Sequence, residues 1–493
     1  MRNLNNKGFA ISTILYSLLV MATLILFLLI GNLSFERRST DDFVSDIEDE
    51  LNALVGGGEP VELNSLAETL LADESNNINK SDSEQTFITG ENPNNYIWYS
   101  GKLWRAVSID PTDNSVKAVT QWNISSIPFS KGERPYSNSY AEMWLNDESV
   151  DGFLGNLREP EKFIKDNSLW NATITTGTSK PAKTTMVENP VGLLNSYEYT
   201  MSYTGASSST GYLNNGLWWF LITQYNTSLI RGVDKSGSIA NDVNGNSAGL
   251  RPAINFEPTM KVAAGSGTEN DPYRLAGDND ISLNGMALNT RYSGEYVRFG
   301  TGDNNLYRIV SHEESGLTKI TSDEPLKENG KFKVLAFGNN TTFSASNTIG
   351  QFLNTDYLNI NNGYLTNDQI SMIVDSNTWY FGSVKDGENY RLAKYTDYTM
   401  ENLTANRTTA KIGLLRLGEL MAGQFSNSTG SKDYFTLTPH NQYLKYIYID
   451  SDANEILPTS ASGIKPTFNL KESVIISSGT GTKDDPFILE NNL

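Results

Sequence analysis

The first part of the chain shows a long apolar pattern. From Phe9 to Leu33 the residues are almost all apolar and none is charged. A helix needs about 20 such residues to cross a bilayer, whereas the apolar region of a cleaved secretory signal has roughly 7 to 15. The run therefore predicts an uncleaved helix that crosses the membrane once.

Beyond this run the pattern changes to that of an amphipathic helix. Apolar residues recur at helical spacing up to Leu54, and acidic residues occupy the other faces. We therefore expect a single helix over 9–55, transmembrane first and amphipathic afterwards. Three glycines and Pro60 then end the helix, and the mostly polar residues that follow indicate a linker over 56–95.

From Tyr96 onward, short runs of aromatic and β-branched residues predict strands separated by polar loops. Tyr96–Tyr99 and Leu103–Val107 are joined by Ser100-Gly101, as in a hairpin. A helix is expected within 141–157. The remaining predicted elements are strands at 217–223 and 229–233, a turn at Asp234-Lys235-Ser236-Gly237, and closing strands through Ile254 and Tyr273. The fold class that follows is α+β with much loop.

The same series of motifs occurs twice along the chain. Gly249-Leu250-Arg251-Pro252 returns as Gly463-Ile464-Lys465-Pro466, and Gly265-Ser266-Gly267-Thr268 returns at the same offset as Gly479-Thr480-Gly481-Thr482. Earlier pairs keep the same order: Tyr96 with Tyr296, Leu103-Trp104-Arg105 with Leu306-Tyr307-Arg308, Trp144-Leu145-Asn146 with Phe352-Leu353-Asn354, Trp170 with Trp379, Gly192-Leu193-Leu194 with Gly413-Leu414-Leu415, Glu198 with Glu419, and Trp218-Trp219 with Tyr434-Phe435. Two tandem copies of one domain are therefore predicted, over 96–275 and 281–490.

Composition narrows the possible chemistry. The formal net charge is −19, and a polyanion repels phosphate backbones, so nucleic acid is excluded as the main partner. The chain has no cysteine and only two histidines, His312 and His440. Disulfides, Cys/His zinc sites, iron–sulfur clusters and thiol nucleophiles are thereby excluded, and no cofactor is predicted. An acidic, cysteine-free region rich in Asn, Ser and Thr is typical of the bacterial exterior. The predicted localisation is the cell membrane, crossed once, with the C-terminal region extracellular.

One group of acidic residues has part of a calcium-loop pattern. Asp450, Asp452 and Asn454 have the 1, 3, 5 spacing of such a loop. However, Glu455 stands at the glycine position and Ala461 at the position of the bidentate glutamate. No metal site is therefore predicted.

The remaining candidates concern structure and ligand binding. Glu198 and Glu419 occur at matching positions, where a buried, hydrogen-bonded structural role is expected, so we predict no enzyme activity. Aromatic faces complement the apolar faces of sugar rings, so a sugar-stacking surface could be formed by Trp98, Trp104, Trp144, Trp170, Trp218 and Trp219. Of the repeated motifs, Trp218, Trp219 and Arg251 are taken as the candidate ligand-binding residues. The alternative is that the tryptophans pack in the core and that Arg251 pairs with a carboxylate to close the module.

The N-terminal residues resemble the leader of type IV pilins and pseudopilins. A basic leader over 1–8 ends in Gly8, and Phe9 begins the apolar run. The resemblance implies that a prepilin-type peptidase cuts between Gly8 and Phe9 and that the new N-terminal phenylalanine is methylated. Pilins usually carry a glutamate at the fifth mature position, where this chain has Thr13. The resemblance therefore implies a minor or tip subunit, with other pilin-like subunits as partners, rather than a major filament subunit.

The repeated motif series resembles a widespread, uncharacterised bacterial surface domain, which is distantly similar to C-type-lectin-like modules. This resemblance implies a pilin-like, membrane-anchored surface protein that displays two lectin-like modules for adhesion or recognition. Its expected partners are the membrane, the peptidase, and a surface ligand that is a carbohydrate or a protein. Two alternatives remain: a membrane-anchored extracellular carbohydrate-active enzyme, and a structural spacer of the envelope. An aromatic cleft would favour binding, paired carboxylates would favour catalysis, and neither feature would favour a spacer.

Overall fold

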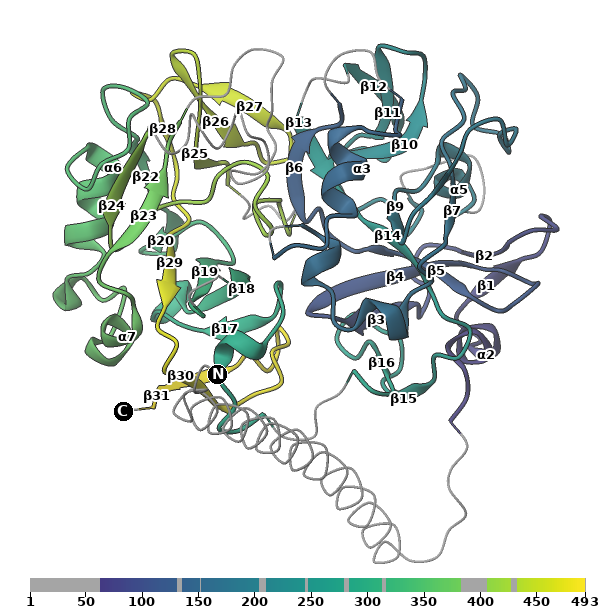
Figure 1. The fold of residues 1–493 in the computed structure, drawn as a ribbon, viewed down its shortest axis with the longest axis horizontal. Helices are drawn as coiled ribbons and strands as arrows, with labels where there is room; N and C mark the ends of the chain where they lie inside the picture. The colour runs from purple at the N-terminus through teal and green to yellow at the C-terminus, as the bar shows by residue number, and fades with distance from the viewer. Residues whose placement is uncertain are drawn as a thin grey trace, which may run out of the picture. The chain divides into compact units, whose positions relative to one another are not determined.

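The computed structural model describes residues 63–130, 135–150, 152–203, 210–243, 247–278, 283–312, 316–382, 406–426 and 432–492. From Asn64 onward these residues belong to one unit. Strands take up 35% of them and helices 13%. The predicted α+β class is therefore wrong, because the described part of the chain is mainly β (Figure 1).

The predicted membrane anchor also needs correction. Among the residues that the structure describes, we find no helix with the length and apolar character needed to cross a membrane. On this finding, the predicted localisation as a single-pass protein of the cell membrane is wrong. The leader over 1–8 and the helix over 9–55, which include Phe9–Leu33, lie outside the described residues.

The helices are short because side chains cap them early and tie them to the sheets. The helix expected within 141–157 is limited to α3 (Tyr140–Leu145) and the 3-10 turn η1 (Leu154–Asn156). Asn146 ends α3. Its Nδ2 donates to the carbonyls of Glu142 and Val191, both at 3.0 Å, and its Oδ1 accepts from the Val191 N–H at 3.0 Å. The chain is thereby fixed to a strand instead of continuing as a helix.

We call residues 96–275 the first repeat. Its strands are coloured purple to teal in Figure 1. Most strands of a nine-stranded sheet belong to this repeat. Seven strands follow the order β15-β16-β3-β4-β5-β14-β9, β2 pairs with β4, and β1 pairs with β2. Its strands are β1 (Asn77–Asn79), β2 (Thr86–Thr89), β3 (Tyr96–Tyr99), β4 (Lys102–Ile109), β5 (Val116–Thr120), β9 (Val191–Gly192), β14 (Ala253–Phe256), β15 (Val262–Ala264) and β16 (Tyr273–Leu275).

A second sheet of five strands accompanies it in the order β12-β11-β10-β13-β6. These strands are β6 (Ser125–Pro128), β10 (Trp219–Gln224), β11 (Leu229–Val233), β12 (Ile239–Val243) and β13 (Ser247–Leu250). The smaller elements are β7 (Leu169–Asn171) paired with β8 (Met186–Glu188), and the helices α2 (Leu66–Ala72), α4 (Pro160–Phe163) and α5 (Ser196–Thr200).

The hairpin predicted at the start of the first repeat is confirmed. Strands β3 and β4 pair antiparallel, with Tyr99 opposite Lys102. Ser100 and Gly101 join them with φ angles of 52° and 72°. Positive φ at both central residues is the requirement of a tight type I′ turn, which suits the twist of antiparallel strands.

Polar residues before Tyr96 are part of the fold rather than a free linker. Thr86 of β2 pairs with Ile109 of β4, and α2 buries Leu66 and Leu70. The side chain of Asn76 is 7% exposed and donates to the Leu70 carbonyl at 3.0 Å. A polar segment can be buried when such internal hydrogen bonds replace water.

We call residues 281–490 the second repeat. Its strands are coloured green to yellow in Figure 1. One sheet has the order β17-β18-β19-β29 and another the order β22-β28-β25-β26-β27. These strands are β17 (Tyr296–Arg298), β18 (Leu306–His312), β19 (Thr318–Ser322), β22 (Val334–Ala336), β25 (Tyr434–His440), β26 (Tyr443–Ile447), β27 (Ala453–Ile456), β28 (Ala461–Gly463) and β29 (Thr467–Leu470).

Smaller elements complete the second repeat. The strand pairs are β20 (Lys327–Glu328) with β21 (Lys331–Phe332), β23 (Asn377–Tyr380) with β24 (Arg407–Ala410), and β30 (Val474–Ser478) with β31 (Ile488–Asn491). The helical elements are η3 (Leu288–Thr290), η4 (Gly302–Asn304), α6 (Thr348–Gln351), η5 (Phe352–Asp356), η6 (Ile360–Asn362) and α7 (Asn367–Met372).

The paired motifs make matching contacts in the two repeats. A Cβ added to Gly192 would lie 2.2 Å from the ring of Trp170, and one added to Gly413 would lie 2.3 Å from the ring of Trp379. Asn354 binds the backbone of Ile412 as Asn146 binds that of Val191. Each glycine thus lets a tryptophan lie flat on the backbone.

One pairing from the motif series shifts by a residue. Trp219 of β10 lies beside Gly249 in parallel register, and Tyr434 of β25 lies beside Gly463 in the same way. Tyr434 therefore corresponds to Trp219 rather than to Trp218. A loop that differs by one residue between the repeats hides this shift from sequence alignment.

The two repeats share core and backbone contacts. Residues of the second repeat from Leu415 to Phe425 pack in the hydrophobic core of the first. The Trp218 N–H donates to the Asp450 carbonyl at 2.6 Å, and the Gly423 N–H donates to the Ile124 carbonyl at 3.2 Å. The repeats therefore meet in a fixed interface, which positions the site described next.

Candidate functional site

Two neighbouring pockets lie between the repeats. Their volumes are about 280 Å³ and about 320 Å³, and both are lined by Trp98 and Arg274. These two residues come from adjacent strands and form the wall that the pockets share. We refer to the two pockets together as the inter-repeat cleft.

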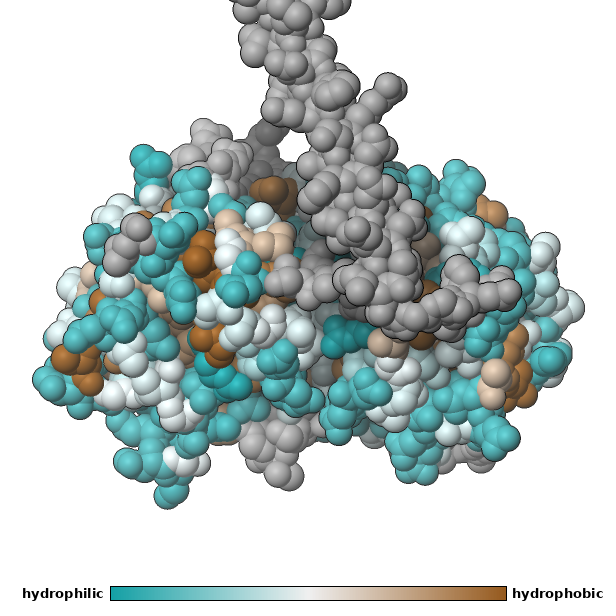
Figure 2. Space-filling model, turned by 90° about the horizontal axis from the view of Figure 1, so that it is seen from below, coloured by the Kyte–Doolittle hydropathy of each residue, from teal (hydrophilic) through white to brown (hydrophobic). Residues whose placement is uncertain are grey.

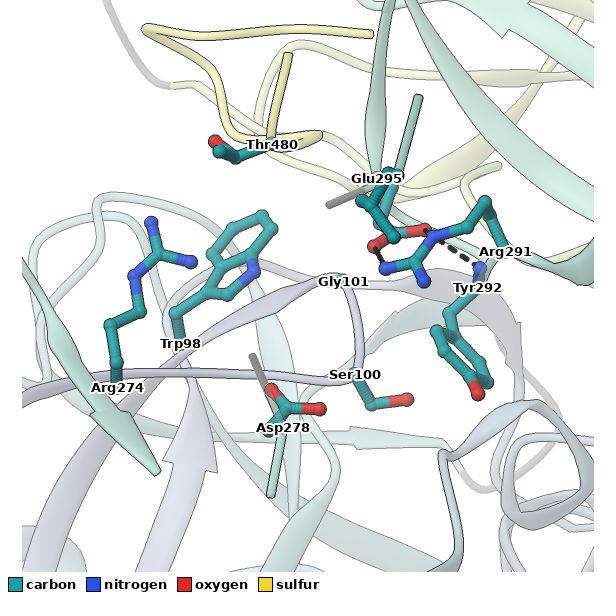
Figure 3. A pocket seen from close by; sticks show the side chains of 10 residues that line it. Trp98, Ser100, Gly101, Arg274, Asp278, Arg291, Tyr292, Glu295 and Thr480 are labelled. Atoms are coloured by element: carbon teal, nitrogen blue, oxygen red, sulfur yellow. Dashed lines mark hydrogen bonds and ion pairs between the residues drawn. The ribbon is translucent and has the colours of Figure 1, made fainter. Parts of the chain in front are cut away.

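The smaller pocket contains two buried carboxyl groups, so we call it the acidic pocket (Figure 3). Glu295 accepts from Arg291 Nη2 at 2.6 Å, from Arg291 Nε at 3.2 Å and from the Tyr292 N–H at 2.8 Å. Burial raises the pKa of Glu295, and the Arg291 guanidinium opposes this rise. Glu295 is therefore committed to a bidentate ion pair within the second repeat.

Asp278 is the second carboxyl group of the acidic pocket. Its side chain is 5% exposed, and the nearest guanidinium nitrogen, Arg158 Nε, lies 3.9 Å away. Burial raises the pKa of Asp278 to about 7, and the negative charge of Glu295 adds to this effect. Near neutral pH the Asp278 carboxyl group can therefore carry a proton and act as a hydrogen-bond donor.

The larger pocket is lined by four aromatic rings, so we call it the aromatic pocket. The rings belong to Trp98, Trp122, Tyr296 and Phe425. Arg308 also lines it, with its guanidinium 4.4 Å from the ring centre of Tyr296 and 4.4 Å from that of Phe425. The Nη2 of Arg308 donates to the Gly294 carbonyl at 2.8 Å. Arg308 is therefore held in place by the protein itself.

Two loops of matching sequence meet at the aromatic pocket. We call residues 265–272 and 479–486 the glycine-threonine loops. Glu269, Asn270 and Pro272 come from the loop of the first repeat, and Thr482, Lys483 and Asp484 from that of the second. Gly267 and Gly481 have φ angles of +74° and +75°, which side chains rarely adopt. A Cβ at either glycine would also lie within 2.5 Å of an aromatic ring, that of Tyr273 or Phe487. The two loops thus have the same shape for the same physical reason.

Arg274 differs from the other arginines of the cleft. Its guanidinium lies 5.7 Å from the ring centre of Trp98. Within the described residues it forms no hydrogen bond and no ion pair, whereas Arg291 and Arg308 are both bonded. Figure 3 shows Arg274 and Trp98 side by side at one wall of the acidic pocket, opposite the Arg291–Glu295 pair.

The ligand-binding residues proposed from the sequence lie elsewhere. Trp219 and Arg251 are both 0% exposed. Arg251 donates to the carbonyls of Thr120 at 2.8 Å and Leu213 at 2.7 Å, and its guanidinium lies 4.4 Å from the Trp219 ring. Burial lowers the pKa of Arg251 to about 9. Trp218 is half-buried and packs edge-to-face on Phe220. None of the three lines the cleft, and two of them are core residues.

The processing residues proposed from the sequence, Gly8 and Phe9, lie outside the described residues. Neither of the two histidines lines the cleft. His312 contacts Thr318 and the carbonyl of Arg291, and His440 contacts Glu455. Neither histidine lines a pocket described here.

Glu198 and Glu419 have the structural role expected of them. Glu198 pairs with Lys117 at 2.5 Å and Glu419 with Lys319 at 3.0 Å. Each also accepts a backbone N–H three residues before it, from Asn195 at 2.9 Å and from Arg416 at 2.5 Å. A third pocket of about 370 Å³ lies around Lys117 and Glu198 and is lined mainly by lysines, amides and hydroxyls. Its four lysines are all paired with carboxylates.

In the described part of the chain, no three His, Cys, Asp or Glu side chains are grouped so that they could hold a metal ion. The space-filling view shows mostly hydrophilic residues on one face, with small, separate apolar patches (Figure 2). Searches with family models, with curated proteins and with solved structures found no match to this chain.

Proposed function

We propose that this protein is a recognition protein that binds a saccharide in the cleft between its two repeats. The observation that carries the proposal is that the glycine-threonine loops of both repeats line one pocket with four aromatic rings. Aromatic faces complement the apolar faces of sugar rings, and the polar groups of the loops supply hydrogen bonds that fix a ligand.

The location of the cleft refines the function expected from the lectin-like resemblance. Two independent modules would each have a site of their own, whereas the cleft takes Trp98 from one repeat and Tyr296 from the other. The proposal is therefore one site for each chain, built by the pair of repeats. A spacer role has less support, because a spacer needs no pocket with a guanidinium that has no ion-pair partner among the described residues.

A second candidate function is hydrolysis of a glycosidic bond. It is favoured by Asp278, whose pKa is raised to about 7, beside Glu295, which Arg291 holds as an ion. Two carboxyl groups that face one cleft are the usual acid and base of such enzymes. Binding has the stronger support, because both oxygens of Glu295 are already used by Arg291 and Tyr292.

The experiment is an affinity measurement on the full chain with a panel of neutral and acidic oligosaccharides. Trp98→Ala should weaken binding about fivefold, since the loss of an aromatic platform is worth roughly 1 kcal/mol. Tyr448→Ala is the matched control, because Tyr448 is exposed and lies outside the cleft. Thermal unfolding of both variants shows whether each one folds. Binding that Trp98→Ala leaves unchanged, or no binding to any saccharide, would contradict the proposal.

The same panel decides between binding and hydrolysis. If the protein only binds, the saccharides are recovered intact after incubation. If it hydrolyses them, new reducing ends form, and Asp278→Asn abolishes their formation while binding persists.

A further inference from the structure

We infer that the saccharide bound in the cleft carries a carboxylate, which Arg274 holds while the sugar ring lies against Trp98. The ligand class is that of uronic and sialic acids. This inference rests on the proposed saccharide function and names its ligand more closely.

The pairing of two strands places Arg274 beside Trp98. Strands β16 and β3 run parallel, with Tyr273 opposite Ile97 and Arg274 opposite Trp98. Directly paired residues point to the same face of a sheet. Tyr273 and Ile97 are buried in the core, at 3% and 0% exposure, whereas Trp98 is 7% exposed and lines both pockets with the half-buried Arg274. Arg274 and Trp98 therefore share the opposite face, which lines the cleft.

The Arg274 guanidinium has no hydrogen-bond or ion-pair partner among the residues that the structure describes. It is half-buried, and burial lowers its pKa, although it stays cationic at neutral pH. Asp278 and Asp271 are the acidic groups that influence it, but neither forms an ion pair with it in the described residues. A partly desolvated cation without a partner gains most from a bound anion.

The other two arginines that line the cleft already have partners within the protein. Arg291 is paired with Glu295, and Arg308 donates to the carbonyl of Gly294. Because burial raises the pKa of Asp278 to about 7, part of the Asp278 population carries a proton at neutral pH and can donate it to a ligand oxygen. A guanidinium fork beside an aromatic ring matches a ligand that presents a planar carboxylate on a ring with an apolar face.

The test uses the full chain and pairs of ligands that differ only in the carboxylate. Oligogalacturonate, oligoalginate, hyaluronan oligosaccharides and sialyllactose are each compared with their carboxyl-reduced forms by calorimetry. The expected result is that at least one acidic form binds about tenfold more tightly than its reduced form, as for one charge-assisted contact.

The variants separate a specific contact from general attraction. Arg274→Gln should remove the preference for the acidic form without weakening binding of the reduced form. Arg274→Lys should restore part of the preference, because lysine keeps the charge and loses the bidentate fork. The control is Arg407→Gln, which removes one exposed positive charge outside the cleft and should leave the preference unchanged.

Each outcome supports or overturns the inference. Equal binding of acidic and reduced forms, or a preference that persists in Arg274→Gln, overturns it while the proposed saccharide function survives. Failure of every acidic and neutral saccharide to bind overturns both. Equal binding of a glutamate oligopeptide shows that the cleft selects negative charge rather than a sugar, which overturns the ligand class.

Discussion

Lys102 of the first repeat and Ser293 of the second are joined by two hydrogen bonds. The Lys102 ammonium donates to the Ser293 carbonyl at 2.9 Å and to its hydroxyl at 3.1 Å. It also donates to the Ser100 carbonyl at 3.0 Å, at the turn of the hairpin that leads into the cleft. This contact joins the two repeats beside Trp98. The acceptors in these three hydrogen bonds are uncharged, so the buried ammonium is not paired with a carboxylate in them.

Burial lowers the pKa of Lys102 to about 7, from a usual value of 10.5. The folded state therefore binds fewer protons than the unfolded state between these values, so the wild type becomes more stable as pH rises from about 7 to 10. We predict that Lys102→Met removes this gain, and that its stability relative to the wild type is higher at pH 6 than at pH 10. Urea unfolding at both pH values checks this. A difference that does not change with pH would show that Lys102 is charged equally in both states.

Asp278 should produce the opposite pH dependence. Its pKa is raised from 3.8 to about 7 in the folded state. Between these values the folded state binds more protons than the unfolded state, so the wild type becomes less stable as the pH rises from about 4 to 7. Asp278→Asn keeps a neutral side chain at every pH. We predict that the variant matches the wild type near pH 4 and is more stable above pH 7, by at most about 4 kcal/mol.

The control for Asp278→Asn is Asp375→Asn. The Asp375 side chain is 87% exposed, so it should show no such gain at high pH. If Asp278→Asn is equally stable relative to the wild type at pH 4 and pH 8, Asp278 does not carry a raised pKa. Unfolding curves followed by tryptophan fluorescence supply the measurement.

The matching glycine–tryptophan contacts predict matching losses of stability. Gly192→Ala and Gly413→Ala would each place a methyl group inside the van der Waals radius of a buried indole. We predict that each variant loses about 2 to 4 kcal/mol of unfolding free energy, because neither ring has room to move. Gly177→Ala is the control, since its Cβ would meet its nearest neighbour at an ordinary 3.7 Å. A large loss at one position and none at the other would mean that the two contacts are not equivalent.

Processing at the N-terminus stays a prediction from the sequence. If a prepilin-type peptidase acts on the chain, protein from the native host begins at Phe9 with a methylated amine, and Gly8→Val retains the leader because a side chain blocks the cleavage site. Intact-mass measurement distinguishes the two forms. A wild-type chain that still begins at Met1 would remove the basis of the pilin resemblance.

Strand positions could be predicted where the pattern was local. The alternation at Tyr96–Tyr99 and the turn at Ser100-Gly101 predict the hairpin, because both depend only on neighbouring residues. Strand β2 was missed, since its burial depends on pairing with β4 and not on an alternating pattern of its own. The helix expected within 141–157 was overestimated, because Asn146 binds a distant strand at its end.

The site depended on contacts that no local pattern encodes. Trp219 and Arg251 stand in repeated motifs because both repeats need the same core packing, so the repetition marked structure rather than ligand binding. Arg274 follows the repeated Asp-Pro-aromatic sequence and has no counterpart in charge, since Ile488 follows Phe487 in the second repeat. The sequence therefore did contain one signal for the site, namely a charged residue at only one of two matching positions. That both loops meet in one cleft follows only from the docking of the repeats.

The central claim is that a saccharide binds between the repeats. The most direct measurement is photocrosslinking of the full chain with a photoreactive form of the tightest-binding saccharide from the panel, followed by mass spectrometry of the labelled peptides. The account predicts labels in both glycine-threonine loops, within 265–274 and 479–487, that an excess of unlabelled saccharide suppresses. If the suppressible labels lie only in the third pocket, around Lys117 and Glu198, or only on the exposed surface of one repeat, the claim that a saccharide binds between the repeats is contradicted.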